Sequence, residues 1–177
     1  LKSVTSMGLV TQAFKEEDLL KLSGSIAIGH TRYSTSGSSL LCNAQPIVIN
    51  GPYTDLALAH NGNVVNAVAL KKELEALGCN FTSTSDTEII AHLLTNAPVS
   101  DWEQRIQYIV RRVQGAYSLA ILTKDSLIAV RDPLGVRPLC VGTINGGWIV
   151  ASESCALDNL GATFEAHVRS SRNTKPA

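Results

Sequence analysis

The chain of 177 residues has no excess of either charge and few aromatic side chains. Lys and Arg number 15 against 15 Asp and Glu, and Phe, Trp and Tyr make up 5% of the residues. Proteins that bind nucleic acids usually present a basic surface and aromatic rings that stack on bases, so this composition argues against such a partner. The apolar runs are far shorter than the ~20 residues that a membrane helix needs, so we expect no membrane contact either. What remains is the composition of an ordinary globular domain, with 45% hydrophobic residues.

The cysteines are far apart and form no Cys-x-x-Cys pair, which argues against a zinc site, a thioredoxin-like centre and cluster ligation. They are Cys42, Cys79, Cys140 and Cys155. Most have apolar neighbours, so we expect buried, reduced thiols in a cytoplasmic protein, with a plastid or another organelle as the alternative location. An internal cysteine nucleophile with His30, His60 or His92 as its base is a further alternative. The apolar surroundings disfavour it, because they raise the pKa of a thiol.

The two ends of the sequence bear on how the chain is divided. The chain begins without Met and without the basic and apolar regions of a secretion signal, so we expect it to be a piece of a longer protein. Apolar periodicity stops near the other end, and residues 167–177 are predicted to form a disordered tail. Residues 1–166 then make up a single partial domain.

Short runs of alternating or β-branched residues predict six strands. They span residues 26–30, 56–60, 116–123, 126–131, 139–143 and 148–152. Apolar residues at helical spacing predict three helices between the second and third strands. Their markers are Leu70, Leu74 and Leu77, then Ile89, Ile90, Leu93 and Leu94, then Trp102, Ile106, Ile109, Val110 and Val113. Helices grouped apart from antiparallel strands favour an α+β layered fold over a parallel doubly wound sheet.

The second and third helices each start with the pattern of a capping box, Ser85 to Glu88 and Ser100 to Glu103. In such a box the Ser and Glu side chains each accept a hydrogen bond from the backbone N–H of the other residue. The pattern therefore predicts helix starts at Ser85 and Ser100.

The predicted strand 56–60 runs into His60-Asn61-Gly62-Asn63, where we expect it to leave its sheet abruptly. Gly and Asn tolerate backbone angles that are closed to other residues, and a tight turn is the simpler interpretation. A backbone N–H beside a side-chain amide at a strand end can also form an oxyanion hole, the donor pair that stabilises a tetrahedral intermediate of acyl transfer. This motif alone leaves both interpretations open.

Arg32 and Asp86 carry complementary groups near other predicted element ends. A guanidinium matches a carboxylate bidentately and a carboxylate pairs with an ammonium, so together they could hold both ends of an amino-acid zwitterion. The positive end of the predicted helix would keep Asp86 ionised. The alternatives are a helix-start acid that only stabilises the helix dipole, for Asp86, and an ion pair with Asp86 or another acid, for Arg32.

Several long segments in one order resemble the glutaminase domain of the glutamine amidophosphoribosyltransferase family, from about residue 8 to residue 162. They are residues 28–35, 43–46, 58–63, 85–88, 131–139 and 151–158. The resemblance implies an N-terminal-nucleophile hydrolase fold, an αββα sandwich of antiparallel sheets between helical layers, here without its first strand and helix. Residues 1–166 would be a partial glutamine amidotransferase type 2 domain.

The same resemblance implies roles for the candidate site residues. Arg32 would bind the α-carboxylate of glutamine and Asp86 its α-ammonium, while the Asn61 side chain and the Gly62 N–H would form the oxyanion hole. Residues 131–139 would be structural, a strand end followed by turns that proline fixes. Cys155 would be a thiol of the core rather than the nucleophile.

In the family the nucleophile is a cysteine at the mature N-terminus, and its own α-amine is the general base. This chain begins at Leu1, inside the domain, so we expect it to bind glutamine but to be inactive by itself. A Cys-Gly start encoded upstream of Leu1 would favour an enzyme, and a true start near Leu1 would favour a non-catalytic amino-acid-binding module.

The resemblance implies that the complete enzyme converts glutamine, phosphoribosyl diphosphate and water to phosphoribosylamine, glutamate and pyrophosphate, the first committed step of purine nucleotide biosynthesis. The partner that accepts ammonia would be a phosphoribosyltransferase domain of the same chain, which would use magnesium. We expect no cofactor or metal in the present chain, and a homo-oligomer when full length. Another class II glutamine amidotransferase, such as glucosamine-phosphate synthase, is the alternative enzyme, and residues 33–35, 43–46 and 152–158 favour the purine enzyme over it.

Overall fold

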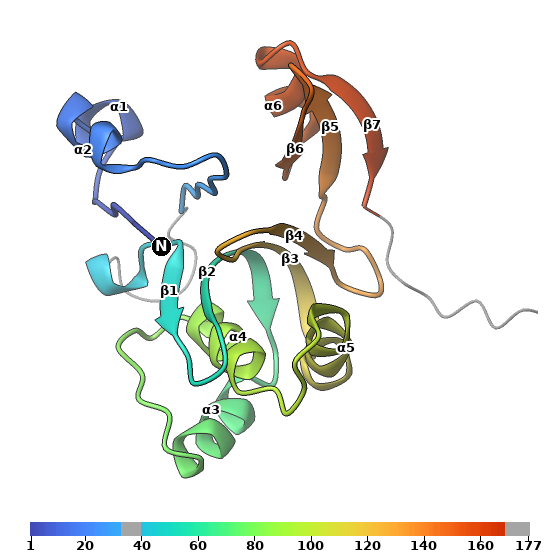
Figure 1. Cartoon of the computed structure of the whole chain (residues 1–177). Helices are drawn as coiled ribbons and strands as arrows, with labels where there is room; N and C mark the ends of the chain where they lie inside the picture. Colours follow the sequence, from blue (N-terminus) through green and yellow to red (C-terminus); the bar gives the residue numbers. More distant parts are fainter. Residues whose placement is uncertain (33–39, 169–177) are drawn as a thin grey trace, which may run out of the picture.

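The structure is a computed structural model that describes residues 1–32 and 40–168. Two antiparallel sheets lie one above the other (Figure 1). The larger has the strand order β1 (Ile47–Asn50), β2 (Asp55–Val64), β3 (Gly115–Leu122) and β4 (Leu127–Arg131). The smaller has the order β6 (Gly147–Ala151), β5 (Cys140–Ile144) and β7 (Thr163–His167).

Helices lie on the outer side of the larger sheet and against the smaller one (Figure 1). Helices α3 (Ala67–Ala76), α4 (Asp86–Thr95) and α5 (Trp102–Arg112) lie below the larger sheet, and α6 (Ser154–Asn159) packs on β6 and β7. The short helices α1 (Val10–Ala13) and α2 (Glu16–Lys21) and the 3-10 turn η1 (Leu41–Asn43) precede β1. This arrangement confirms the expected α+β class. In the described residues, no helix has both the length and the apolar character that crossing a membrane requires.

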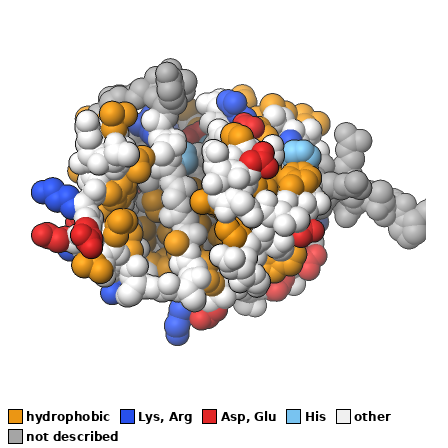
Figure 2. Space-filling model, turned by 90° about the horizontal axis from the view of Figure 1, so that it is seen from above, with side chains coloured by type: hydrophobic (Ala, Val, Ile, Leu, Met, Phe, Trp, Pro, Cys, Tyr) orange, Lys and Arg blue, Asp and Glu red, His pale blue; other side chains and the backbone are white. Residues whose placement is uncertain are grey.

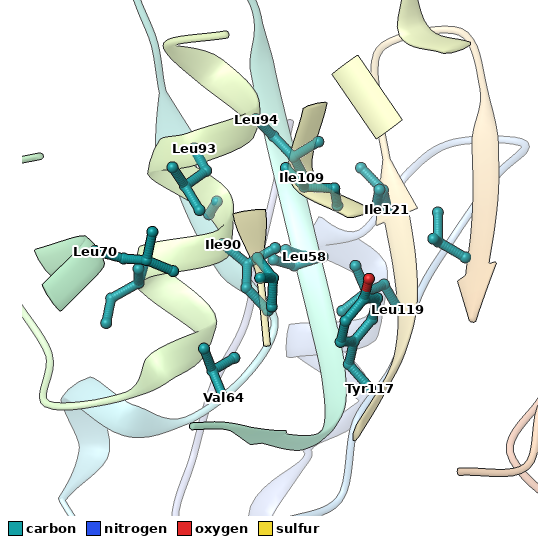
Figure 3. Packing of buried hydrophobic residues seen from close by; sticks show 14 of the residues in the cluster. Leu58, Val64, Leu70, Ile90, Leu93, Leu94, Ile109, Tyr117, Leu119 and Ile121 are labelled. Atoms are coloured by element: carbon teal, nitrogen blue, oxygen red, sulfur yellow. The ribbon is translucent and has the colours of Figure 1, made fainter. Parts of the chain in front are cut away.

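The main core lies between α4 and the larger sheet. Helix α4 is buried along nearly its whole length, because it contacts the sheet on one side and α3 and α5 on the others. Figure 3 shows Ile90 and Leu94 of this helix packed with Leu58 and Leu119 of the sheet. All four side chains are essentially inaccessible to water, so this contact supplies much of the apolar burial that stabilises the fold.

The opposite face of the larger sheet carries small and polar side chains. Successive residues of a strand point to opposite faces, so Leu58 and His60 lie on the helix side while Ala59 and Asn61 lie on the side of the smaller sheet. On β3, the residues opposite Ala59 and Asn61 are Ala120 and Ser118. Small residues on two adjacent strands leave space between the sheets.

Five of the six predicted strands are confirmed, as β2 to β6. The prediction of a strand at residues 26–30 is wrong, because this segment pairs with no strand in the described part of the chain. Its alternate side chains are half-buried, so the alternating pattern that predicted a strand reflects burial of one side of an extended segment that has no hydrogen-bonded partner strand among the described residues. Strands β1 and β7 and helices α1, α2 and α6 were not predicted.

Strand β2 does not leave its sheet at His60, so both the expected abrupt exit and the turn interpretation are wrong. Pairing with β3 continues through Gly62, opposite Tyr117, to Val64, opposite Gly115. Glycine is required at residue 62 for another reason. A Cβ there would lie 2.0 Å from the Ala116 carbonyl oxygen, so only glycine allows the two strands to approach this closely.

The predicted capping boxes form only in part. Ser85 caps α4, but its oxygen accepts from the Thr87 N–H, and the Glu88 carboxylate bonds to the preceding loop instead of returning to Ser85. At α5 the cap is Asp101 rather than Ser100, and its carboxylate accepts from the Gln104 N–H at 3.1 Å. The capping residue of each helix lies within one residue of the predicted position.

The predicted tail begins too early. His167 is the last residue of β7, and the Val168 N–H donates to the Leu139 carbonyl at 2.8 Å. The rest of the predicted tail, residues 169–177, lies outside the described residues. Of the thiols, Cys140 is buried as expected, but Cys155 is exposed on α6 and is therefore not part of the core.

Residues 131–139 contain the expected strand end and turn, and Arg137 and Leu139 of this segment also line the space between the sheets. Asp132 is fully buried in the turn after β4, and its carboxylate accepts hydrogen bonds from the backbone N–H groups of Tyr117, Leu134 and Val136. The Arg131 guanidinium donates to carbonyls of the same turn. Burial, with a contribution from the Asp132 charge, raises the pKa of Tyr117 to about 12.

Replacing Leu94 with Ala tests the position of the core. Leu94 is fully buried, so its truncation is expected to lower the free energy of unfolding by about 2–5 kcal/mol, measured by urea denaturation. The matched control is Val68→Ala on α3, which is 72% exposed and is expected to change stability by less than about 0.5 kcal/mol. Equal effects of the two changes would contradict this description of the core.

Candidate functional site

A cavity of about 900 Å³ lies between the two sheets. Its walls include the small-residue face of β2 and β3, the segment before residue 33, the loop before α4, and parts of β6 and α6. Figure 2 looks down onto this side of the molecule and shows its surface hollowed, with hydrophobic side chains among white atoms of other side chains and backbone along the hollow. Arg32, Asn61, Gly62 and Asp86 all line this cavity. The structure thus brings together the residues that sequence reasoning selected from three separate segments.

Asp86 lies where the end of β2 meets the start of α4. Its Oδ2 accepts a hydrogen bond from the Val64 N–H at 2.9 Å, and its Oδ1 lies 3.5 Å from Nδ1 of His60. Burial raises the pKa of Asp86, but the His60 side chain and the Val64 and Thr87 N–H groups outweigh it and hold the pKa below its ordinary value of 3.8. The expectation that Asp86 stays ionised near neutral pH agrees with this direction.

His60 has its side chain on the helix side of β2, the strand whose other face forms part of the cavity wall. Its side chain is 1% exposed, and Nδ1 lies 3.3 Å from Oγ1 of Thr87 as well as near Asp86. Its Nε2 is buried without a hydrogen-bond partner among the described residues and lies 2.8 Å from the position that a Cβ on Gly62 would take. His60 therefore packs between Asp86 and the backbone of Gly62. Sequence reasoning considered this residue only as a possible base for a cysteine.

Hydrogen bonds to the buried Glu88 carboxylate fix residues 82 and 83 of the loop before α4. This carboxylate is 1% exposed and accepts from the N–H and hydroxyl groups of both Thr82 and Ser83, at 2.6 to 2.9 Å. Burial raises the pKa of Glu88, but these four donors outweigh it, so the pKa is lowered. The next residues, Thr84 and Ser85, then face the cavity.

Arg32 and His30 form another part of the cavity wall. Arg32 is half-buried, and residues 33–35 of the same segment lie outside the described residues. Burial lowers the pKa of His30 and the nearby Arg32 charge lowers it further, which together outweigh the opposing effect of a hydrogen bond with the His60 backbone. A neutral imidazole next to Arg32 leaves the guanidinium as the main positive charge on this side of the cavity.

Comparison with known proteins identifies the family. The family described as a glutamine amidotransferase domain matches residues 30–159. The chain belongs to the glutamine amidotransferase domain family. Its relatives include amidophosphoribosyltransferase 3, chloroplastic, of Arabidopsis thaliana, which is 47% identical over 95% of this chain and 32% of that protein. The amidophosphoribosyltransferase of Archaeoglobus fulgidus is 44% identical over 93% of the chain and 36% of that protein.

Solved structures agree with this membership. The glutamine phosphoribosylpyrophosphate amidotransferase from B. subtilis, complexed with ADP and GMP, superposes with a TM-score of 0.83 at 40% identity, over 92% of this chain and 35% of that one. A structure described as the allosteric regulatory enzyme of purine biosynthesis gives a TM-score of 0.85 at 41% identity, over the same shares of the two chains. The likeness confirms the expected N-terminal-nucleophile hydrolase-like α+β fold. The chain spans about a third of the length of the relatives it matches.

The glutamine amidotransferase fold offers no evident metal site here. Within residues 1–32 and 40–168, no three side chains of His, Cys, Asp or Glu lie close enough together to hold a metal ion. The Glu88 carboxylate is instead satisfied by N–H and hydroxyl donors of the protein.

The ionisation of Asp86 predicts how stability depends on pH. Because its folded-state pKa is lowered, its charge contributes stability at pH values above 3.8, and this contribution is lost as the pH falls through the folded-state pKa. We expect the difference in unfolding free energy between wild type and Asp86→Asn to shrink as the pH falls from about 5 to about 2, measured by urea denaturation. A difference that stays constant over this range would contradict the assignment.

Proposed function

We propose that this chain is the glutamine-hydrolysing portion of an amidophosphoribosyltransferase and that the cavity between the sheets binds glutamine. The single observation that carries the proposal is the gathering of Arg32, Asn61, Gly62 and Asp86 around one cavity. The amidophosphoribosyltransferase names of relatives 44% to 47% identical to the chain support the choice of enzyme.

The charged residues match the two ends of free glutamine. The Arg32 guanidinium would hold the α-carboxylate through two parallel hydrogen bonds, and the ionised Asp86 would accept from the α-ammonium. Asp86 already accepts from the Val64 N–H, but a carboxylate has about four acceptor positions, so capacity for an ammonium remains. Binding the zwitterion at both ends directs the side-chain amide toward the β2 wall.

The β2 wall would stabilise the reaction intermediate. In the complete enzyme an N-terminal cysteine thiolate would attack the glutamine side-chain amide, so that a C–S bond forms and negative charge gathers on the former carbonyl oxygen. The Asn61 side-chain amide and the Gly62 N–H would donate to that oxygen. The C–N bond then breaks as the amide nitrogen takes up the proton lost by the thiol and leaves as ammonia, and water hydrolyses the thioester to glutamate and restores the thiol.

The proposal includes a second half of the enzyme. Ammonia would pass to C1 of phosphoribosyl diphosphate on a phosphoribosyltransferase domain of the same protein, expelling pyrophosphate, and magnesium would serve that domain. Homo-oligomerisation of the full-length enzyme and a cytoplasmic or plastid location are further parts of the proposal. The chloroplastic names of the plant relatives support the plastid location.

Replacing Arg32 with Lys in the full-length enzyme tests the binding role. Lys cannot reproduce the planar fork, so the KM for glutamine is expected to rise about 10- to 100-fold, as expected for loss of a hydrogen bond to a charged group. Synthesis driven by added ammonia is expected to stay unchanged, since it bypasses the cavity. Both activities are measured by steady-state kinetics, and an equal fall of the two would make Arg32 a structural residue.

Replacing Asn61 with Ala tests the oxyanion hole. Loss of one donor is expected to raise the barrier for acylation by about 2.7–4 kcal/mol, which lowers kcat for glutamine about 10²- to 10³-fold. Thermal unfolding of the variant provides the control for folding. A folded Asn61→Ala enzyme with the turnover number of wild type would remove Asn61 from the mechanism.

A further inference from the structure

Residues 43–46 run from the end of η1 to the start of β1 beside the cavity, and two of them bind its walls. Asn43 is 1% exposed and forms a reciprocal pair with Thr84, 41 positions away. Its Nδ2 donates to Thr84 Oγ1 at 3.0 Å, and its Oδ1 accepts from the Thr84 N–H at 2.9 Å. Thr84 lines the cavity two residues before Asp86.

Gln45 makes a similar link to the other wall. Its Oε1 accepts from the His60 N–H at 2.6 Å, immediately before Asn61. The pairing of β1 with β2 starts at Ile47, opposite Leu58, and the same register continued backwards would place Gln45 opposite His60. The Gln45 side chain thus supplies an acceptor for β2 just beyond the point where the backbone ladder with β1 ends.

We propose that Asn43 and Gln45 are positioning residues that together set the distance between the two halves of the glutamine site. Asn43 holds the loop that presents Asp86, and Gln45 holds the part of β2 that presents Asn61 and Gly62. The assignment rests on the proposed function. Gln45 itself lines the cavity and Asn43 does not, but each is assigned its role through the segment to which it is bonded.

The other contacts of the loop explain why Asn43 is needed. Glu88 holds Thr82 and Ser83 from below, and Asp86 is fixed by the Val64 N–H. Thr84 lies between these two anchors, and Asn43 bonds both its N–H and its hydroxyl. Without Asn43 the loop can shift relative to Arg32, which weakens binding of the zwitterion but leaves the oxyanion donors in place.

Loss of Gln45 has the opposite consequence. The buried backbone N–H of His60 would lose its acceptor, and β2 would gain freedom just before the two oxyanion donors. A displacement of about 1 Å at reacting groups can cost about 100-fold in rate. The charged groups that bind the ends of glutamine lie on other segments, so the effect falls on turnover rather than on binding.

The experiment compares kinetic constants of variants in the full-length enzyme. Asn43→Ala is expected to raise the KM for glutamine about 10-fold or more with kcat within about 3-fold, and Gln45→Leu to lower kcat about 10-fold or more with KM within about 3-fold. Gln45→Glu keeps an acceptor for the His60 N–H and is expected to restore most of kcat. Thr84→Val, which loses only the hydroxyl, is expected to raise KM by less than Asn43→Ala and replaces it if that variant does not fold.

Asn66→Ala is the matched control. Asn66 also makes two hydrogen bonds to backbone, with Arg112 O and the Gln114 N–H, but it joins α3 to the α5–β3 connection and does not line the cavity. It is expected to lower the thermal midpoint without changing KM or kcat. The proposal would be overturned if Asn66→Ala showed the same kinetic change as Asn43→Ala. It would also be overturned if KM and kcat changed in parallel in both positioning variants, or if Gln45→Glu failed to recover turnover.

Hydrogen exchange separates this inference from the proposed function. Asn43→Ala is expected to speed exchange at the Thr84 amide and Gln45→Leu at the His60 amide, each without affecting the other, whatever the ligand is. Unchanged exchange at both amides would overturn the positioning assignment even if glutamine is the substrate. Localised exchange in a full-length enzyme that does not hydrolyse glutamine would instead refute the proposed function.

Discussion

The carboxylate of Asp86 joins the two parts of the molecule on which both fold and site depend. It accepts from the last residue of β2 and sits at the first residue of α4, the helix that fills the core. The same contact fixes the position of the helix on the sheet and the position of a negative charge at the cavity. Since α4 cannot move without moving Asp86, the packing of the core sets the geometry of the site.

The alternation of side chains between the two faces of β2 and β3 also serves both the fold and the site. Leucines on one face pack against α4, while alanine, asparagine and serine on the other face leave the space that forms the cavity. A strand with large residues on both faces would close the gap between the sheets. The close approach of the strands at Gly62 then brings a backbone N–H, an asparagine amide and the buried His60 ring within one short stretch of β2.

Local patterns were enough to predict what depends on nearby residues. Periodicity gave the helices α3 to α5 and the strands β2 to β6, and chemical type selected Arg32 and Asp86. The predictions that failed concern pairing between residues far apart in the sequence. Residues 26–30 have the burial pattern of a strand but no paired strand in the described part of the chain, whereas β1 and β7 exist because β2 and β5 pair with them. The continuation of β2 beyond His60 depends on Gly115, more than fifty positions later, which leaves room for the strands to approach.

The contacts of Asn43 and Gln45 were equally invisible in the sequence, because their partners lie 41 and 15 positions away. Their chemistry nevertheless suits the site. Both are neutral amides, so they fix two walls of the cavity without adding a charge that would compete with Arg32 or Asp86 for a zwitterion. The buried charge of Glu88 is satisfied by four donors of its own loop. Because these hydrogen bonds are neutral or satisfied within the protein, they do not compete with Arg32 and Asp86 for the charged ends of a ligand.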